Sequence, residues 1–218
     1  PHKEQIADFL DQVDPGARRA GSINTVVRRG KILEGYSTDG YGLAMATHEA
    51  FGVDLDGRTV AFLGCGGAAR ATAVYFAAEG AREIVLINRT IEKAYRIRDI
   101  IQEVAPDCRA VCIENDNHDA IRDALKRSQI LYQATSLGLR SNDPMPLDPE
   151  LLPQRLAVMD MIYRPTPFLN AATERGCQTA DGRAMLLHQG ARSLMMWTGH
   201  PAPLEAMRQA LWNALAAR

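Results

Sequence analysis

A chain of 218 residues is somewhat longer than one average domain, so one large domain and two small ones are both open. Apolar residues make up 46% and charged residues 23% of the chain, which is ample for a packed core. The formal net charge is −1, and Lys and Arg are scattered among Asp and Glu, which excludes the basic footprint of a nucleic-acid-binding protein. No apolar run approaches the roughly 20 residues that a membrane-spanning helix needs, so we expect no membrane association.

The first fifty residues predict one small α/β unit. Its expected elements are an amphipathic helix at 6–13 ended by Pro15-Gly16, two strands at 23–27 and 32–36 around a turn at 29–31, a loop at 38–40, and a helix at 41–51 closed by Gly52. The chain opens Pro1-His2-Lys3 with no Met and no signal peptide, so we expect its natural start to lie upstream.

The hydrophobic period then changes. Continuous apolar runs of strand length alternate with helical segments, as in a parallel sheet covered by helices on both faces. We expect strands at 59–63, 84–87, 110–113, 130–134 and 157–161, with helices at 68–79, 91–104 and 119–127. The proline-rich stretch 142–153 predicts a surface crossing, and helices at 183–198 and 204–217 close the chain. The predicted fold is α/β, with a Rossmann-type doubly wound parallel sheet.

The four cysteines do not have the spacing of a zinc site. Cys108 and Cys112 are four residues apart, but no second pair of cysteines or histidines completes a ligand set. We therefore expect no metal. The cysteines are typical of reduced thiols in a cytoplasmic protein.

A glycine-rich segment lies between the first buried strand and the helix that follows it. Gly64-Cys65-Gly66-Gly67-Ala68-Ala69 matches the pattern G-x-G-x-x-G/A in the context where that pattern binds dinucleotides. Gly64 permits the tight turn and Gly66 lets the backbone approach a pyrophosphate, which the helix N-terminus then binds. The alternative is a turn that packs strand against helix and binds nothing.

The end of the second buried strand indicates which dinucleotide. An NAD site places an acidic residue about 20 residues beyond the glycines, whereas here the strand ends Asn88-Arg89-Thr90, with Lys93 one helical turn later. Arg89 can bind a 2′-phosphate with its planar guanidinium, and Lys93 adds a second positive charge. Two solvated cations are the alternative, but cations oppose the dipole at a helix N-terminus unless an anion binds there. NADP is the predicted cofactor.

A few polar residues stand where a core would not need them: Lys3, Asn24, Thr38-Asp39-Gly40 and Gln189. Reducing a ketone places charge on its oxygen, so a positioned proton donor such as a lysine is required, and an aspartate beside the lysine would orient it. Each also has a plain structural interpretation: Lys3 as a surface charge, Asp39 as a turn or helix cap, and Gln189 as a solvated helix residue.

The chain resembles the shikimate dehydrogenase family, which includes quinate dehydrogenases, along essentially its whole length. The segments similar to motifs of that family, all in the family's order, are Pro1-His2-Lys3-Glu4, 21–25, Thr38-Asp39-Gly40-Tyr41-Gly42, 64–68, Asn88-Arg89-Thr90, 134–136, 160–163 and 181–191.

This resemblance implies roles for individual residues. Lys3 would be the catalytic acid/base and Asp39 its partner. Asn24, Thr38, Tyr163 and Gln189 would line the substrate pocket. Met161 and Gly182 would lie near the nicotinamide. The remaining implied cofactor contacts are Gly64, Gly66, Gly67 and Ala68 for the pyrophosphate, and Asn88, Arg89, Thr90 and Lys93 for the adenosine 2′-phosphate.

The resemblance also implies two domains, with hydride passing from NADPH to 3-dehydroshikimate in the cleft between them. The expected division is a substrate-domain fragment at 1–40, an NADP-binding Rossmann domain at 41–181, and helices at 182–218 that return to the substrate domain. Family members carry about one further half-domain before the lysine, on the scale of roughly 50 residues, so the smaller α/β domain is incomplete here. We expect residues to be missing from the sequence.

Two other functions stay open at this point. One is a quinate or dual quinate/shikimate dehydrogenase, for which an acidic residue in place of Asn88 would have been the pointer. The other is a non-catalytic ligand-binding protein on the same scaffold, against which the retention of both Lys3 and Asp39 argues. The expected partner is a small-molecule substrate, and the expected assembly is a monomer or homodimer.

Overall fold

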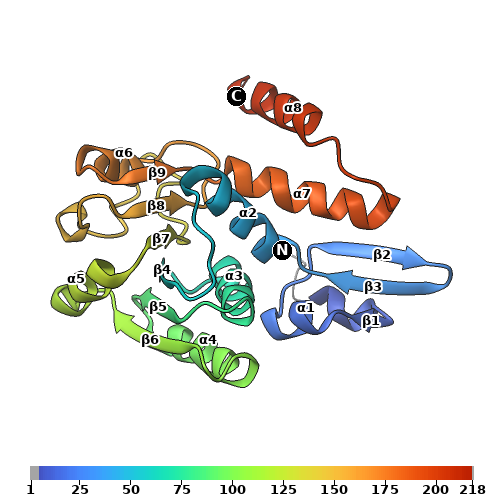
Figure 1. The fold of residues 1–218 in the computed structure, drawn as a ribbon, viewed down its shortest axis with the longest axis horizontal. Helices are drawn as coiled ribbons and strands as arrows, with labels where there is room; N and C mark the ends of the chain where they lie inside the picture. Colours follow the sequence, from blue (N-terminus) through green and yellow to red (C-terminus); the bar gives the residue numbers. More distant parts are fainter. Residues whose placement is uncertain (1–4, 218) are drawn as a thin grey trace.

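The computed structural model describes residues 5–217 and contains two β-sheets joined by helices (Figure 1). The larger sheet has six strands, all parallel to their neighbours, in the order β6-β5-β4-β7-β8-β9. Its strands are β4 (Thr59–Leu63), β5 (Glu83–Asn88), β6 (Arg109–Glu114), β7 (Ile130–Gln133), β8 (Ala157–Asp160) and β9 (Gln178–Ala180). This is the order of a dinucleotide-binding Rossmann sheet, whose strand order reverses between β4 and β7.

Helices cover both faces of the six-stranded sheet because alternate strand residues point to opposite faces. Val60 and Phe62 of β4 belong to one core cluster, with residues of α2 (Asp39–Phe51), α3 (Gly67–Ala78) and α4 (Ile91–Val104). Ala61 and Leu63 belong to a second cluster on the other face, with residues of α5 (His118–Arg127) and α6 (Pro167–Glu174). Both faces of the central strands β4, β5, β7 and β8 are therefore buried, as the continuous apolar runs predict.

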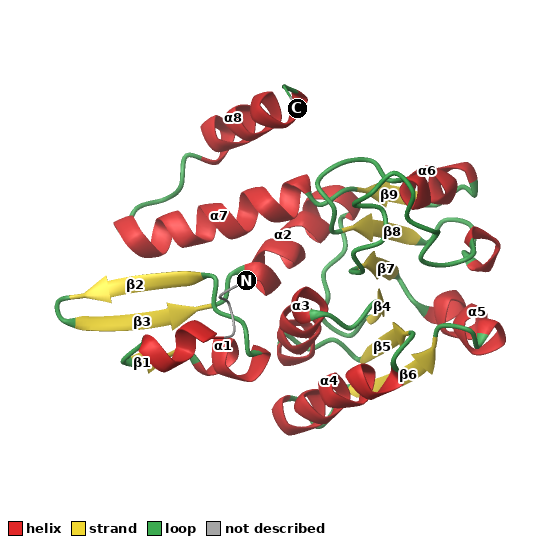
Figure 2. Ribbon diagram, turned by 180° about the vertical axis from the view of Figure 1, so that it is seen from behind, coloured by secondary structure: helices red, strands yellow, loops and turns green. Residues whose placement is uncertain are grey.

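The smaller sheet contains three strands in the order β1-β3-β2. β2 (Thr25–Arg29) and β3 (Ile32–Tyr36) form the predicted antiparallel hairpin, and β1 (Gln12–Val13) pairs in parallel with β3. Helix α1 (Pro15–Ala20) connects β1 to the hairpin. Figure 2 shows this sheet at the opposite end of the molecule from α5 and α6, with α2, α3 and α7 between them.

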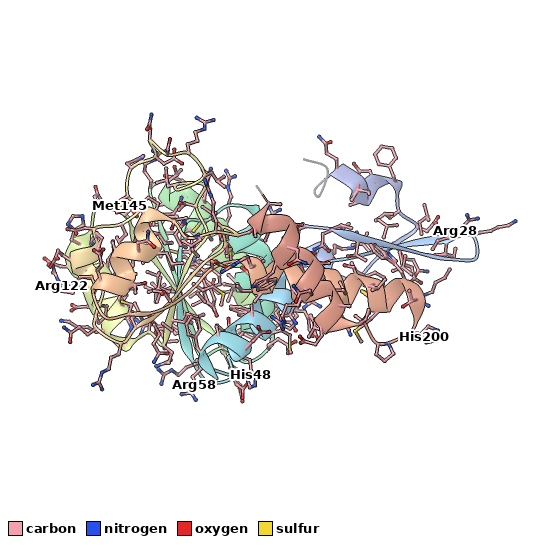
Figure 3. All side chains as sticks on the ribbon, turned by 90° about the horizontal axis from the view of Figure 1, so that it is seen from above. Arg28, His48, Arg58, Arg122, Met145 and His200 are labelled. Carbon is pink, nitrogen blue, oxygen red and sulfur yellow. The ribbon has the colours of Figure 1, made fainter. Side chains whose placement is uncertain are left out.

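Two helices close the chain. α7 (Arg183–Thr198) packs along α2 and reaches the hairpin, where the Trp197 indole N–H donates to the Val26 carbonyl at 2.8 Å. α8 (Leu204–Ala216) follows a short loop and packs on α7 with no fully buried residue. Figure 3 shows the elongated shape that results, with Arg28 and His200 at one end and Met145 and Arg122 at the other. No helix among residues 5–217 is long and apolar enough to span a bilayer.

The prediction of one helix over 6–13 is wrong. Gln5–Phe9 form a short 3-10 helix, and the chain then extends into β1, where the Asp11 carboxylate accepts the Leu33 N–H at 2.7 Å. Pro15 begins α1 instead of ending a helix, because the Asp14 side chain caps Ala17 N–H at 3.1 Å and proline is pre-set for the first helical position.

Three other predictions need correction. Asp39 and Gly40 are not a loop, because α2 begins at Asp39. The stretch 142–153 does not simply cross the surface: it contains a 3-10 turn, η2 (Pro149–Leu151), and several of its leucines are buried against the α5 and α6 face. Helix α6 and strand β9 were not predicted at all; the signal for α6 is Thr166-Pro167, where the threonine hydroxyl caps Leu169 N–H at 3.2 Å.

Candidate active site

The glycine-rich loop follows β4 at the point where the strand order reverses. Gly64 has φ of 98°, and a Cβ placed on it would lie 2.7 Å from Thr135 Cγ2 and 3.0 Å from Thr135 N. Only glycine fits that close approach to the loop after β7. A Cβ on Gly66 or Gly67 would meet nothing within 4 Å, so this side of the loop is open. Gly66 stands at the N-cap of α3, and the free N–H groups of the first turn can bind an anion there.

Two adjoining cavities lie along the loop, at the carboxyl ends of the strands. The larger has about 570 Å³ and is lined by residues 64–68, Asn88, Lys93, 134–136, Leu139 and 161–163. The smaller has about 300 Å³ and is lined by Leu63, Gly64, 87–90, Lys93, Asn115, 135–137, Met145 and Pro146. The crevice at such a switch point is where doubly wound sheets bind their ligands.

Asn88 connects the two loops that border the smaller cavity. Its Oδ1 accepts the Cys65 N–H at 3.0 Å, and its Nδ2 donates to the Thr90 carbonyl at 2.7 Å. Arg89 and Lys93 are exposed and line the cavity, and none of the described residues that line it is acidic. A group with two negative charges therefore fits this end of the crevice better than a free ribose hydroxyl.

The thiol within the glycine-rich loop is not a reactive group. Cys65 is buried, and its burial raises the pKa of the thiol to about 12. A thiol with such a pKa stays protonated at neutral pH and is a poor nucleophile. Cys65 therefore contributes to packing.

A second group of polar residues comes together beside the small sheet. Asn24 precedes β2, Asp39 begins α2, and Gln189 lies in the middle of α7. Asn24 Nδ2 donates to Asp39 Oδ1 at 2.7 Å and lies 3.5 Å from Gln189 Oε1. Thr38 joins them, because its N–H donates to Asn24 Oδ1 at 3.0 Å. Four of the residues named from the sequence thus form one hydrogen-bonded group.

Two buried hydroxyls support this group, and sequence reasoning missed both roles. Thr25 Oγ1 and Ser193 Oγ are 2.6 Å apart, and Ser193 Oγ is also 3.3 Å from Thr38 Oγ1. Ser193 lies one helical turn after Gln189, on the same face of α7, which is the one local signal that could have found it. These hydroxyls hold Thr38 and the start of β2 in place against α7.

Close packing of α2 against α7 brings Asp39 and Gln189 into the same polar group. A Cβ on Gly42 would lie 2.9 Å from both Gln189 N and Met185 O, so the two helices approach to within the space of a missing side chain. Glycine at position 42 therefore brings the start of α2 against the middle of α7.

The segment after β8 borders the larger cavity. Met161 and Tyr163 line it, and Gly182 packs so tightly on the Met161 carbonyl that any Cβ would overlap it. Asp160 is fully buried: it accepts hydrogen bonds from Thr166 Oγ1 at 2.6 Å and Ile162 N at 3.0 Å. Burial raises the pKa of this carboxyl. Asp160 anchors the 161–163 segment, a role that the motif in the sequence does not reveal.

The structure thus collects the predicted site residues into two sets. The cofactor set surrounds the crevice, and Asn24, Thr38, Asp39 and Gln189 form the polar group. Tyr163 belongs to the crevice and is about half exposed. Lys3 lies outside the described residues.

The strand order, the glycine-rich loop at the switch point and the cationic crevice define the class of Rossmann-type dinucleotide-binding proteins. The comparison with protein families is more specific. Residues 45–139 match the model described as "Shikimate / quinate 5-dehydrogenase", and residues 182–211 match "Shikimate 5'-dehydrogenase C-terminal domain".

Individual relatives agree with this match. A "Shikimate dehydrogenase (NADP(+))" of Desulforamulus reducens is 40% identical over 222 residues, covering 99% of this chain and 75% of the relative. A shikimate 5-dehydrogenase of Listeria monocytogenes, solved in complex with shikimate and NAD, superposes with a TM-score of 0.91 at 33% identity, covering 97% of this chain and 75% of that one. A Thermus thermophilus shikimate 5-dehydrogenase in complex with NADP(H) and shikimate superposes with a TM-score of 0.81 at 32% identity, covering 98% and 76%. The chain belongs to the shikimate dehydrogenase family.

Proposed function

We propose that the chain is an NADP-dependent shikimate dehydrogenase, which reversibly reduces 3-dehydroshikimate to shikimate in aromatic amino-acid biosynthesis. One observation carries the proposal: Asn24, just before β2, lies within hydrogen-bonding distance of both Asp39 at the start of α2 and Gln189 in the middle of α7. Amide and carboxylate groups arranged in this way can pair with the hydroxyls of a polyhydroxylated ring. Because the chain belongs to the shikimate dehydrogenase family, we assign this ring to shikimate.

The residues around the crevice fit NADP. Gly66, Gly67 and Ala68 lie on the open side of the loop, where backbone N–H groups would hold the pyrophosphate, and Gly64 makes the turn that brings the loop to it. We assign the 2′-phosphate to Arg89 and Lys93, with Thr90 beside them and Asn88 holding the loop in shape. Met161 and Gly182 would form the wall at the nicotinamide end. When bound, the cofactor delivers or accepts the hydride.

The chain's own residues supply positioning and the proton. We assign Lys3 as the proton donor to the carbonyl oxygen during reduction, and as the proton acceptor from the hydroxyl during oxidation. Asp39 would orient Lys3 and bind a ring hydroxyl, while the Asn24 amide holds one carboxylate oxygen of Asp39 at 2.7 Å. Thr38, Gln189 and Tyr163 would complete the substrate pocket.

We also propose the division of labour along the chain: a substrate-domain fragment at 1–40, the NADP-binding domain at 41–181 and returning helices at 182–218. The bond between Thr25 and Ser193 supports the return of the last segment to the small sheet. We propose a cytoplasmic enzyme because its four cysteines are free thiols. We propose that the protein is a monomer or a homodimer, and light scattering would distinguish these two assemblies.

Initial rates at 340 nm test the proposal, with shikimate and quinate each offered alongside NADP and NAD. We expect shikimate to be oxidised much faster than quinate, because a site that pairs each hydroxyl discriminates strongly among analogues. We expect NADP to exceed NAD by at least about tenfold in kcat/KM. Equal turnover of quinate would favour the dual-specificity enzyme, and no turnover of any pair would favour a ligand-binding protein.

A further inference from the structure

Helix α3 contacts the backbone at Gly21, near Asn24, and at Gly40, next to Asp39. Its first turn begins at the glycine-rich loop, where Arg70 N donates to the Gly66 carbonyl at 2.9 Å. The Arg70 side chain reaches in the other direction, and its Nη2 donates to the Gly21 carbonyl at 2.7 Å. Five residues later on the same helix, the Tyr75 ring packs on Gly40 so closely that a Cβ there would overlap it.

Gly21 is shaped to accept this contact. It ends α1 in the left-handed conformation, with φ of 56°, and its own N–H is bonded to Arg18 O at 3.1 Å. A Cβ on Gly21 would lie 2.7 Å from Arg70 Nη2 and 3.0 Å from Arg70 Cζ. Glycine is therefore required twice, for the backbone conformation and for the approach of the guanidinium.

The contact lies three residues before Asn24. Ser22 and Ile23 between them are buried at 3% and 5% exposure, so the segment has little freedom to move independently. The hydrogen bond involves a charged donor and is therefore stronger than a neutral one. A displacement of the Gly21 carbonyl would pass through this segment to Asn24 and to its bond with Asp39.

We propose that Arg70 is a positioning residue, which fixes the hydroxyl-binding group Asn24–Asp39 relative to the cofactor loop at the other end of its own helical turn. The inference rests on the proposed function, because it concerns the alignment of shikimate with NADP. Rates of oriented reactions fall steeply when reacting groups are misplaced by about 1 Å. Arg70 acts through the Gly21 carbonyl and needs no contact with shikimate.

A competing role for Arg70 has to be distinguished from positioning. Arg70 also lines a small cavity of about 220 Å³ beside Gly66, Gly67, Lys93 and Arg96, so its charge could act on cofactor phosphates instead. Arg96 supplies the matched control. It brings a positive charge to the same cavity from α4, without a hydrogen bond to the 21–24 segment among the described contacts.

The experiment compares Arg70→Ala, Arg70→Lys and Arg96→Ala with the parent protein, using shikimate kinetics and NADPH binding followed by fluorescence titration. We expect Arg70→Ala to lower kcat/KM for shikimate by about tenfold or more, while the Kd for NADPH stays within about twofold of the parent value. The kcat/KM of Arg70→Lys for shikimate should fall between those of the parent and Arg70→Ala, because an ammonium group can donate to the carbonyl but lacks the reach of the guanidinium. Arg96→Ala should keep the parent's KM for shikimate.

Unchanged shikimate kinetics in Arg70→Ala, or a loss explained entirely by weaker NADPH binding, would overturn the inference. If Arg70→Ala does not fold, Arg70→Lys decides: parental shikimate kinetics in that variant would overturn the inference as well. The parent protein separates this outcome from failure of the proposed function. A parent that oxidises shikimate beside an unaffected Arg70→Ala contradicts the inference alone, whereas a parent without turnover contradicts both.

Discussion

Asn88 and Arg89 are neighbours at the end of β5 with different tasks. The Asn88 amide oxygen accepts the Cys65 N–H, and its nitrogen donates to the Thr90 carbonyl. Arg89 extends into the crevice, where no described lining residue carries a negative charge. The choice of cofactor is therefore expected to depend on Arg89 and Lys93, while Asn88 keeps their loop against the glycine-rich loop.

Arg89→Ala should reduce the preference for NADP over NAD. Losing one charge-assisted contact with a phosphate is expected to raise the KM for NADP by about tenfold, equivalent to about 1.4 kcal/mol. The KM for NAD should change little, because NAD lacks the 2′-phosphate. The matched control is Arg98→Ala on α4, the helix that follows Arg89, because the Arg98 guanidinium pairs with Asp99 at 2.7 Å. An unchanged cofactor preference in Arg89→Ala would contradict the assignment.

The proposed proton donor makes a different prediction. Lys3→Ala should lower kcat by about 10²–10⁴-fold with a much smaller change in KM, since positioned proton transfer acts mainly in the transition state. Asp39→Asn should lower kcat and also raise the KM for shikimate. Asparagine can still accept the Asn24 amide through its own oxygen, so this variant should fold. A Lys3→Ala enzyme within about threefold of the parent would transfer the role elsewhere, with Tyr163 the first candidate.

At the scale of elements, the apolar strands were the most predictable part. β4 and α4 were predicted to the residue, and β5 and β7 nearly so. For the strands the reason is that both faces of the central sheet are buried and each strand is a continuous apolar run. The N-terminal segment was not predictable in the same way. Its apolar residues fit a helical period, but hydrogen bonding to β3 extends the chain there, and that partner is distant in sequence.

Helix α8 depends on one carboxylate for its polar attachment to α2. Glu49 of α2 accepts Arg208 Nη1 at 2.7 Å and also lies 2.7 Å from His188 Nε2 of α7. The hydrogen bond from Arg208 lowers the pKa of the Glu49 carboxyl below its usual 4.5. A lowered carboxyl pKa adds stability above the unfolded value, and that stability is lost as the pH falls through the folded value.

Glu49→Gln should therefore destabilise the protein at neutral pH and lose its effect in acid. The Glu49 side chain is 39% exposed, so solvent screening limits the cost to about 1 kcal/mol or less at pH 7. Urea unfolding measured from pH 7 downward should show the two proteins converging below pH 4.5. Glu103→Gln, at an exposed glutamate of α4, should show no such gap. A gap that persists or widens in acid would contradict this account.

At the scale of the whole molecule, the two halves of the site differ in how far sequence can reach. The cofactor residues follow one strand–loop–helix unit and the next strand, so local patterns locate them. The polar group cannot be found in that way, because Asn24 and Gln189 are separated by 165 positions and meet through the packing of α7 on α2 and on the start of β2. Sequence spacing alone did not distinguish a catalytic role for these residues from an ordinary structural one. Resemblance to a family named them. The supporting roles of Thr25, Ser193 and Asp160 were missed by both approaches, because these side chains bond to other protein groups.

We propose that the polar group binds shikimate and that the crevice beside the glycine-rich loop binds NADP. A crystal structure of the protein with shikimate and NADP tests it most directly. We expect shikimate hydroxyls within hydrogen-bonding distance of Asp39 and Gln189, the pyrophosphate on the loop at 64–68, and the 2′-phosphate between Arg89 and Lys93. Shikimate bound away from Asp39, or a 2′-phosphate directed away from Arg89 and Lys93, would contradict it.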